Sequence, residues 1–138
     1  MNIDELNHIL VLIADKRMEL NRLTYSDIHY DDLEEELHHL EDDLVAHFGK
    51  ELENILHQIH RQYCPETEVL SPIAYLAQNY IKTGLQTNGT AIYDLADNEQ
   101  GLEIDSKDYP SAHLVIVPNP VKILLLANGE IRRAVWEG

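Results

Sequence analysis

The chain has 138 residues, of which 44% are hydrophobic and 25% charged, a balance typical of one globular domain and not of a disordered chain. Its 25 acidic and 10 basic residues give a formal net charge of −15, which disfavours nucleic acid and anionic membrane surfaces as partners because both carry negative phosphates. The single cysteine excludes an internal disulfide, and no apolar run approaches a membrane span of about 20 residues. The acidic N-terminus lacks the features of a signal peptide, so we expect a cytoplasmic location.

The N-terminal segment carries the pattern of an amphipathic helix. From Ile3 to Leu20, apolar residues recur every three or four positions, and Arg17 fills one gap in the stripe. This spacing predicts a helix over about residues 3–22.

A second, longer stripe follows after a polar connector. Apolar residues recur without a break from Leu33 to Ile59 and predict a helix over residues 31–63. Asp31 or Asp32 is the expected N-cap, and the pair Asp31 and Glu34 has the spacing of a capping box. Gly49 is the weak point of this helix, but the stripe continues through it in register, so we predict a continuous or kinked helix.

The length of the second helix has a consequence for assembly. A helix over residues 31–63 would be about 50 Å long, which exceeds the diameter of a domain of this size. The first helix can cover only part of its stripe. Either the C-terminal half or a second copy of the chain has to cover the remainder, and we therefore predict a homo-oligomer, a homodimer built on the helices.

The segment after the second helix fits two interpretations. Ser71-Pro72 is a good helix start, and apolar spacing from Ile73 to Ile81 predicts a short helix over residues 72–83 that Gly84 closes. The isoleucine, tyrosine and threonine content of the same segment also suits a strand, so both interpretations stay open.

The C-terminal half has the alternation of an antiparallel sheet. Asn88-Gly89 and Asn128-Gly129 are typical of tight hairpin turns. Strands are expected near residues 85–87, 90–95, 113–117, 121–127 and 130–136. A two-residue turn at Asn128-Gly129 would pair Ala127 with Glu130. Because residues 123–126 are all apolar, this strand should be covered on both faces, by helices or by a partner.

These elements predict an α+β fold in a single domain over residues 1–138. A long antiparallel helical pair forms the helical subregion, residues 1–64. A short helix and a small antiparallel meander with Asn-Gly hairpins form the mostly β subregion, residues 65–138.

One set of side chains could hold a divalent metal ion. Glu36, His39, Asp43 and His47 follow one face of the second helix, and carboxylate with neutral imidazole suits zinc, iron or manganese. In an antiparallel hairpin, Asp4 and His8 would lie near this set. His57, His60 and Cys64 form a weaker second set. Carboxylate–histidine pairs are also ordinary on an exposed acidic helix, so no cofactor is required.

Three functions are compatible with the sequence. The first is a non-enzymatic protein-interaction or oligomerisation module, because motifs for nucleophilic catalysis and for phosphate-binding loops are absent. The second is an acidic immunity or nucleic-acid-mimic protein that binds a basic protein partner through residues 31–36 and 41–43. The third is a metal-binding helical protein that uses the Glu36 set.

Overall fold

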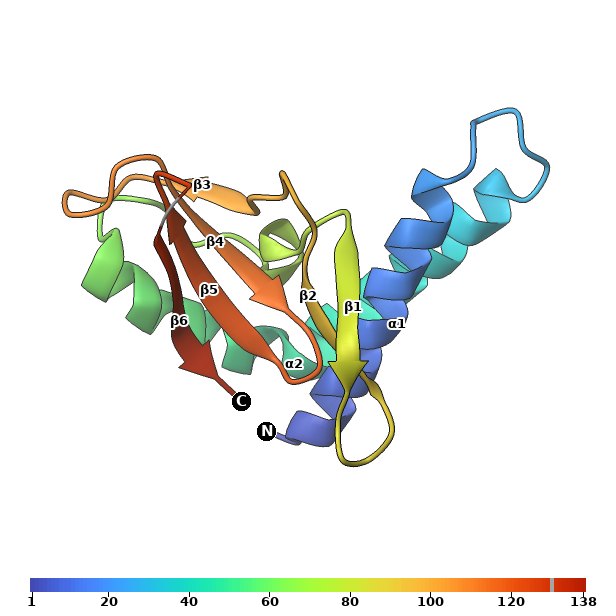
Figure 1. The fold of residues 1–138 in the computed structure, drawn as a ribbon, viewed down its shortest axis with the longest axis horizontal. Helices are drawn as coiled ribbons and strands as arrows, with labels where there is room; N and C mark the ends of the chain where they lie inside the picture. Colours follow the sequence, from blue (N-terminus) through green and yellow to red (C-terminus); the bar gives the residue numbers. More distant parts are fainter. Residues whose placement is uncertain (130) are drawn as a thin grey trace.

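Two long helices precede two antiparallel sheets in this chain, which confirms the predicted α+β fold (Figure 1). The structure is a computed structural model and describes residues 1–129 and 131–138. The elements in chain order are α1 (Ile3–Asn21), α2 (Tyr30–Tyr63), the 3-10 helix η1 (Pro72–Tyr75), β1 (Tyr80–Leu85), β2 (Ala91–Leu95), β3 (Leu102–Ile104), β4 (Ala112–Val117), β5 (Lys122–Ala127) and β6 (Ile131–Glu137). β1 and β2 form one sheet, and β3 to β6 form a four-stranded meander.

The helical pair extends beyond the rest of the molecule. Figure 1 shows the end of α1 and the start of α2 projecting from the sheets, with their connector at the far end. We call residues 16–41 the arm. The rest of α2 runs beneath the four-stranded sheet, so α2 changes direction between the two parts (Figure 1). α2 is continuous through Gly49, as predicted, and a glycine is a position at which a helix tolerates a bend.

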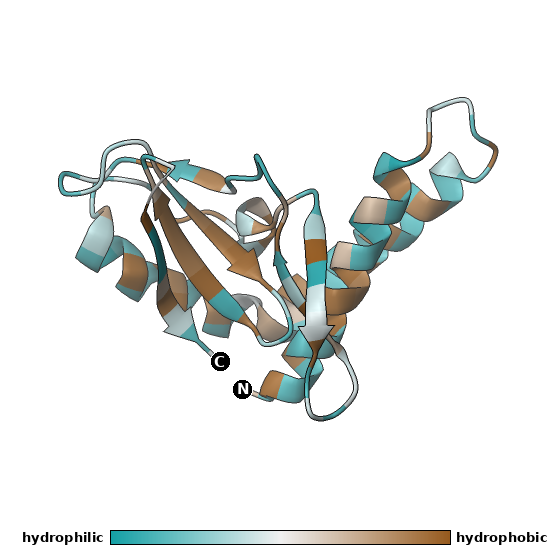
Figure 2. Cartoon of the chain, in the orientation of Figure 1, coloured by the Kyte–Doolittle hydropathy of each residue, from teal (hydrophilic) through white to brown (hydrophobic). Residues whose placement is uncertain are grey.

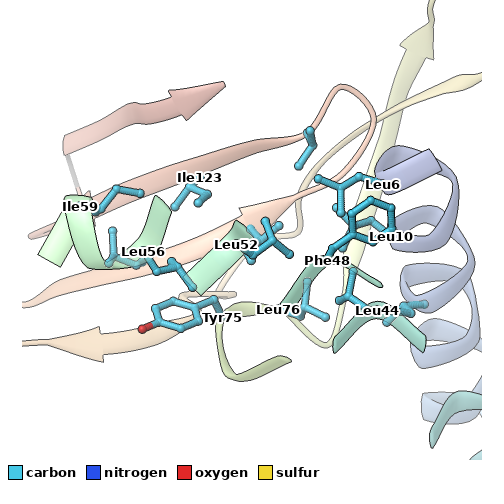
Figure 3. Close-up of a cluster of buried hydrophobic side chains, with 14 of the residues drawn as sticks. Leu6, Leu10, Leu44, Phe48, Leu52, Leu56, Ile59, Tyr75, Leu76 and Ile123 are labelled. Atoms are coloured by element: carbon cyan, nitrogen blue, oxygen red, sulfur yellow. The ribbon is translucent and has the colours of Figure 1, made fainter. Parts of the chain in front are cut away.

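The main core lies between α2 and one face of the four-stranded sheet. Leu44 and Phe48 of α2 lie with Leu6 and Leu10 of α1, whereas the next turns of α2 lie toward the sheet (Figure 3). The buried residues of the second group are Leu52, Leu56, Ile59, Leu114, Ile116, Ile123 and Leu125. The C-terminal half of the chain thus covers the second half of the long stripe. This is one of the two alternatives that the sequence analysis gave for the cover of this stripe.

The opposite face of the four-stranded sheet is covered as well. Val115, Val117 and Leu124 pack against Tyr80 and Tyr93 of the two-stranded sheet. The hydrophobic colouring of β4 and β5 in Figure 2 is therefore matched by neighbours on both faces. This confirms the prediction that the apolar strand is covered on both sides.

The hairpin at Asn88-Gly89 is confirmed. β1 and β2 flank it, the amide of Gly89 donates to the Gln86 carbonyl at 2.9 Å, and the amide of Gln86 donates to the Thr90 carbonyl at 2.8 Å. Gly89 has φ +85°, so the connection is a turn closed by a left-handed residue, a conformation that favours glycine.

The register of the last hairpin differs from the prediction. Ala127 pairs with Ile131 instead of Glu130, and Glu130 itself lies outside the described residues. Leu125 consequently pairs with Arg133, and the register shifts again between Ile123 and Leu124. Each residue from Leu124 to Ala127 is thus paired with the β6 residue one position later than predicted. Side chains of this part of β6 that were expected on one face of the sheet therefore lie on the other.

The predicted helix over residues 72–83 is wrong beyond its first turn, and the alternative interpretation as a strand is confirmed from Tyr80. η1 ends at Tyr75, the backbone of Leu76 is extended, and strand β1 begins at Tyr80. The buried hydroxyl of Tyr80 accepts from the Ala77 amide and donates to the Ile116 carbonyl, both at 2.8 Å. These bonds hold the segment in an extended form against β4 and outweigh its weak helical spacing.

The predicted cap of the second helix is also wrong. α2 begins at Tyr30, its N-cap residue is His29, and no side chain caps it. Instead, the Asp27 carboxylate accepts from the His29 amide at 2.9 Å. Asp31 and Asp32 lie inside the first turn, where their charge favours the positive end of the helix.

Candidate functional site

The four residues of the predicted metal set lie on α2 but are engaged by other groups or exposed. The Glu36 carboxylate accepts from the Lys16 ammonium at 2.7 Å. His39 is 3.7 Å from Glu35 and its side chain is 75% exposed. The His47 ring is bonded through Nδ1 to the backbone carbonyl of Asp43 at 2.9 Å.

The two α1 residues expected beside this set lie elsewhere. Asp4 and His8 line a polar hollow of about 320 Å³ between α1 and the β1–β2 hairpin, and no α2 residue lines it. Over residues 1–129 and 131–138, no group of three or more histidine, cysteine, aspartate or glutamate side chains could hold a metal ion. The metal site stays a prediction from the sequence.

The second histidine and cysteine set forms a structural unit instead of an open site. His60 is buried; its Nδ1 donates to the Thr67 carbonyl at 2.9 Å, and its Nε2 accepts from the Tyr75 hydroxyl at 2.8 Å. The same hydroxyl accepts from the Leu70 amide at 3.1 Å. These bonds fix the orientation of the ring and hold the segment after α2 against η1.

Cys64 carries a testable consequence of burial. The side chain is fully buried, and burial, with a smaller contribution from Asp105, raises the pKa of its thiol from 9.0 to about 11. The unfolded chain loses this proton above pH 9.0 and the folded chain only near pH 11. The contribution of the thiol to stability is therefore present below pH 9 and is lost as the pH rises toward 11.

We expect the urea midpoint of the protein to fall between pH 9 and 11, and the fall to be shallower in Cys64→Ala. Burial also raises the pKa of Tyr80 to about 12, so that variant retains some alkaline destabilisation. Urea titrations at pH 8, 9.5 and 10.5 measure the difference. Equal slopes in both proteins would remove Cys64 from the explanation.

The two neighbouring arginines of β6 lie on opposite faces. Arg132 forms an ion pair with Asp94 of β2. Arg133 donates to the Tyr109 hydroxyl at 3.3 Å. They do not form a joint cationic site.

Buried Arg17 joins the two helices of the arm and bonds them to the rest of the molecule, and the sequence did not reveal these bonds. The guanidinium of Arg17 donates to the carbonyls of Leu76 and Ala77 and to the Glu41 carboxylate, each at 3.3 Å. The Arg17 side chain is 8% exposed and that of Glu41 17%. The only signal in the sequence was an arginine within an apolar stripe.

The far end of the arm exposes apolar side chains. Tyr25 and Ile28 are each 86% exposed, the highest values among the large hydrophobic residues of the described chain. Figure 2 shows hydrophobic segments within this connector. The connector is held by its own bonds, since the Asp27 amide donates to the Thr24 carbonyl at 3.0 Å and the Tyr30 amide to the Asp27 carbonyl at 3.1 Å. The two apolar side chains are thus presented by an ordered turn.

The surroundings of these apolar side chains are strongly acidic. Between Arg22 and Lys50 the sequence contains nine aspartates and glutamates and no lysine or arginine. Most of them lie on exposed positions of α2. The arm therefore combines a projecting shape, an apolar end and a negative surface.

Comparison of the chain with family models, curated proteins and solved structures gave no match. Among the described residues, none of the helices is long and apolar enough to cross a membrane. The functional interpretation consequently depends on the residues of the chain itself.

Proposed function

We propose that this chain is a non-enzymatic protein-interaction module and that the arm is its binding element. The observation that carries the proposal is the 86% exposure of both Tyr25 and Ile28 at the end of a projecting helical hairpin. Exposed tyrosine and isoleucine side chains on an ordered turn are suited to insert into a partner, because aromatic and large apolar residues contribute most to interface energy.

The remaining polar groups of the molecule support a structural role. Buried His60 and Arg17 are satisfied by bonds within the fold. The polar hollow between α1 and β1–β2 contains Asn119, whose amide group already bonds Thr90, Ala91 and Gln86. These groups hold elements of the fold together.

The same features favour a different protein over a second copy as the partner. Two arms brought together would place like charges side by side, which opposes association at moderate salt. The homodimer predicted from the long stripe is a second candidate, because the exposed side chains Leu12 and Val45, near the base of the arm, offer some apolar area. Light scattering at two salt concentrations separates the two assemblies, since screening would favour the homodimer alone.

The experiment that tests the proposal is capture of partners by the immobilised protein from cells that express it. The variant Tyr25→Ser/Ile28→Ser is expected to lose at least about 90% of the captured partner, since loss of two interface anchors costs more than about 2 kcal/mol. Because both side chains are exposed, the variant should unfold at the same temperature as the parent.

A matched control removes an equally exposed apolar residue from another surface. Leu85 of β1 is 72% exposed and lies far along the chain from the arm, so Leu85→Ser should retain the partner. If Leu85→Ser abolishes capture and the double arm variant does not, the arm is not the binding element.

A further inference from the structure

A second feature of the arm suggests what kind of partner it binds. The ends of its two helices enclose a hollow of about 330 Å³, which we call the tip pocket. Two leucines, Leu23 and Leu33, give it apolar walls, and charged or polar side chains from both helices complete it. The latter are Glu19, His29, Asp32 and Glu36.

The charge of the tip pocket is only partly balanced within the chain. Among the described residues, Lys16 is the cation that pairs with its carboxylates; the Lys16 ammonium is 2.7 Å from a Glu36 oxygen and 3.7 Å from a Glu19 oxygen. Three carboxylates against one ammonium leave a net negative charge. The arm also contains Arg17, which is bonded to Glu41 and two carbonyls, and the exposed Arg22, which forms no ion pair with these carboxylates among the described residues. Residues 23–49 contain no lysine or arginine.

The pocket matches the two parts of a long basic side chain. Lysine and arginine bury an apolar stem and keep a charged head near water, which corresponds to leucine walls under a rim of carboxylates. The Glu19 and Glu36 side chains are 53% and 57% exposed, so this rim is open to an approaching partner. Nucleic acid and anionic lipid are disfavoured here because their phosphates would face the same carboxylates.

We propose that the arm docks onto a basic segment of a partner protein, with a lysine or arginine side chain in the tip pocket beside Tyr25 and Ile28. This inference rests on the proposed function and adds the chemistry of the partner. Charge complementarity over the acidic arm steers the basic segment toward it, and the apolar end then contributes the contact that resists salt.

The experiment uses a fluorescent tetralysine peptide and the intact protein, with tetra-acetyl-lysine as the neutral peptide of similar shape. Tetralysine is expected to bind at low salt and to shift the NMR signals of the Leu23 and Leu33 methyl groups, whereas the acetylated peptide does neither. Asp32→Asn should weaken tetralysine binding about threefold to fivefold, the effect of removing one exposed charge partner. Asp42→Asn, the same change on an exposed α2 position outside the pocket, should change it by less than about 1.5-fold.

A change at Lys16 is expected to have the opposite effect on peptide binding. It distinguishes binding in the tip pocket from general electrostatic attraction to the acidic surface. Lys16→Met on α1 removes the internal partner of Glu19 and Glu36 and should strengthen tetralysine binding about threefold. Lys50→Met removes the same charge from α2 outside the pocket and should change the binding by less than about 1.5-fold. Equal effects of Lys16→Met and Lys50→Met, or of Asp32→Asn and Asp42→Asn, would overturn the pocket. Capture could also depend on Tyr25 and Ile28, resist salt and yield an acidic protein. That result would contradict the proposal of a basic partner and leave the proposed function intact.

Discussion

Arg17→Ala is expected to lower the free energy of unfolding by about 3 kcal/mol, because it leaves a partly buried acid and two buried carbonyls without their donor. The lost bonds are those from the guanidinium to the Glu41 carboxylate and to the carbonyls of Leu76 and Ala77. Removal of one partner of such an ion pair costs far more free energy than replacement of both partners by apolar residues. The remaining charge has then lost both its water and its counterion.

Chemical denaturation of the variant measures this loss, and a melting temperature lower by about 10 °C is expected for a chain of this size. Arg22→Ala is the matched control, because Arg22 follows the same helix but is exposed; its effect should stay within about 0.5 kcal/mol. Glu41→Gln should fall between the two, since a glutamine can still accept from Arg17. A loss below about 1 kcal/mol in Arg17→Ala would mean that water reaches this pair and replaces the guanidinium.

Leu52→Ala is the second change with a large expected effect, again about 3 kcal/mol. Leu52 is fully buried at the centre of the core, between the part of α2 that packs on α1 and the part beneath the sheet (Figure 3). Its neighbours belong to different elements and cannot all close on the space that three missing carbons leave. The cost therefore includes a cavity term in addition to the lost transfer free energy.

Val45→Ala provides the control on the same helix. Val45 is 40% exposed, so its truncation should cost less than about 1 kcal/mol, and urea titration of both variants measures the contrast. Similar losses in the two variants would show that helix propensity, and not burial, sets the stability of α2.

The helices could be predicted from the sequence because their signal is local. The stripe from Leu33 to Ile59 places a core residue on one face at each turn of α2, whatever packs against it. The antiparallel pairing followed from the short connector, and the Lys16–Glu36 ion pair lies close to the register expected for such a hairpin. The α+β class and the Asn88-Gly89 hairpin also rest on local patterns.

The errors arise where distant residues decide the local structure. Tyr80 was expected in a helix, but its hydroxyl bonds the carbonyl of Ile116, 36 positions later in the sequence. The short strand β3 was not predicted, because its three residues pair with β4 only once Gly101 brings the backbone close to Leu114. The tip pocket also combines residues of two helices, and its leucine walls could not be located before the connector was known.

Because the arm is long, a small change in the bend of α2 would move its far end by a large distance. From Gly49 to Tyr30 the helix is about 28 Å long, so each degree of rotation at the glycine moves the far end of the arm by about 0.5 Å. On the arm's side of this glycine, α2 is held by buried Phe48 and by the partly buried Glu41 that pairs with Arg17. A force that a bound partner exerts at Tyr25 or Ile28 therefore produces a large torque on these few contacts. Conversely, a small repacking around them would carry the end of the arm through several ångströms while both helices stay intact.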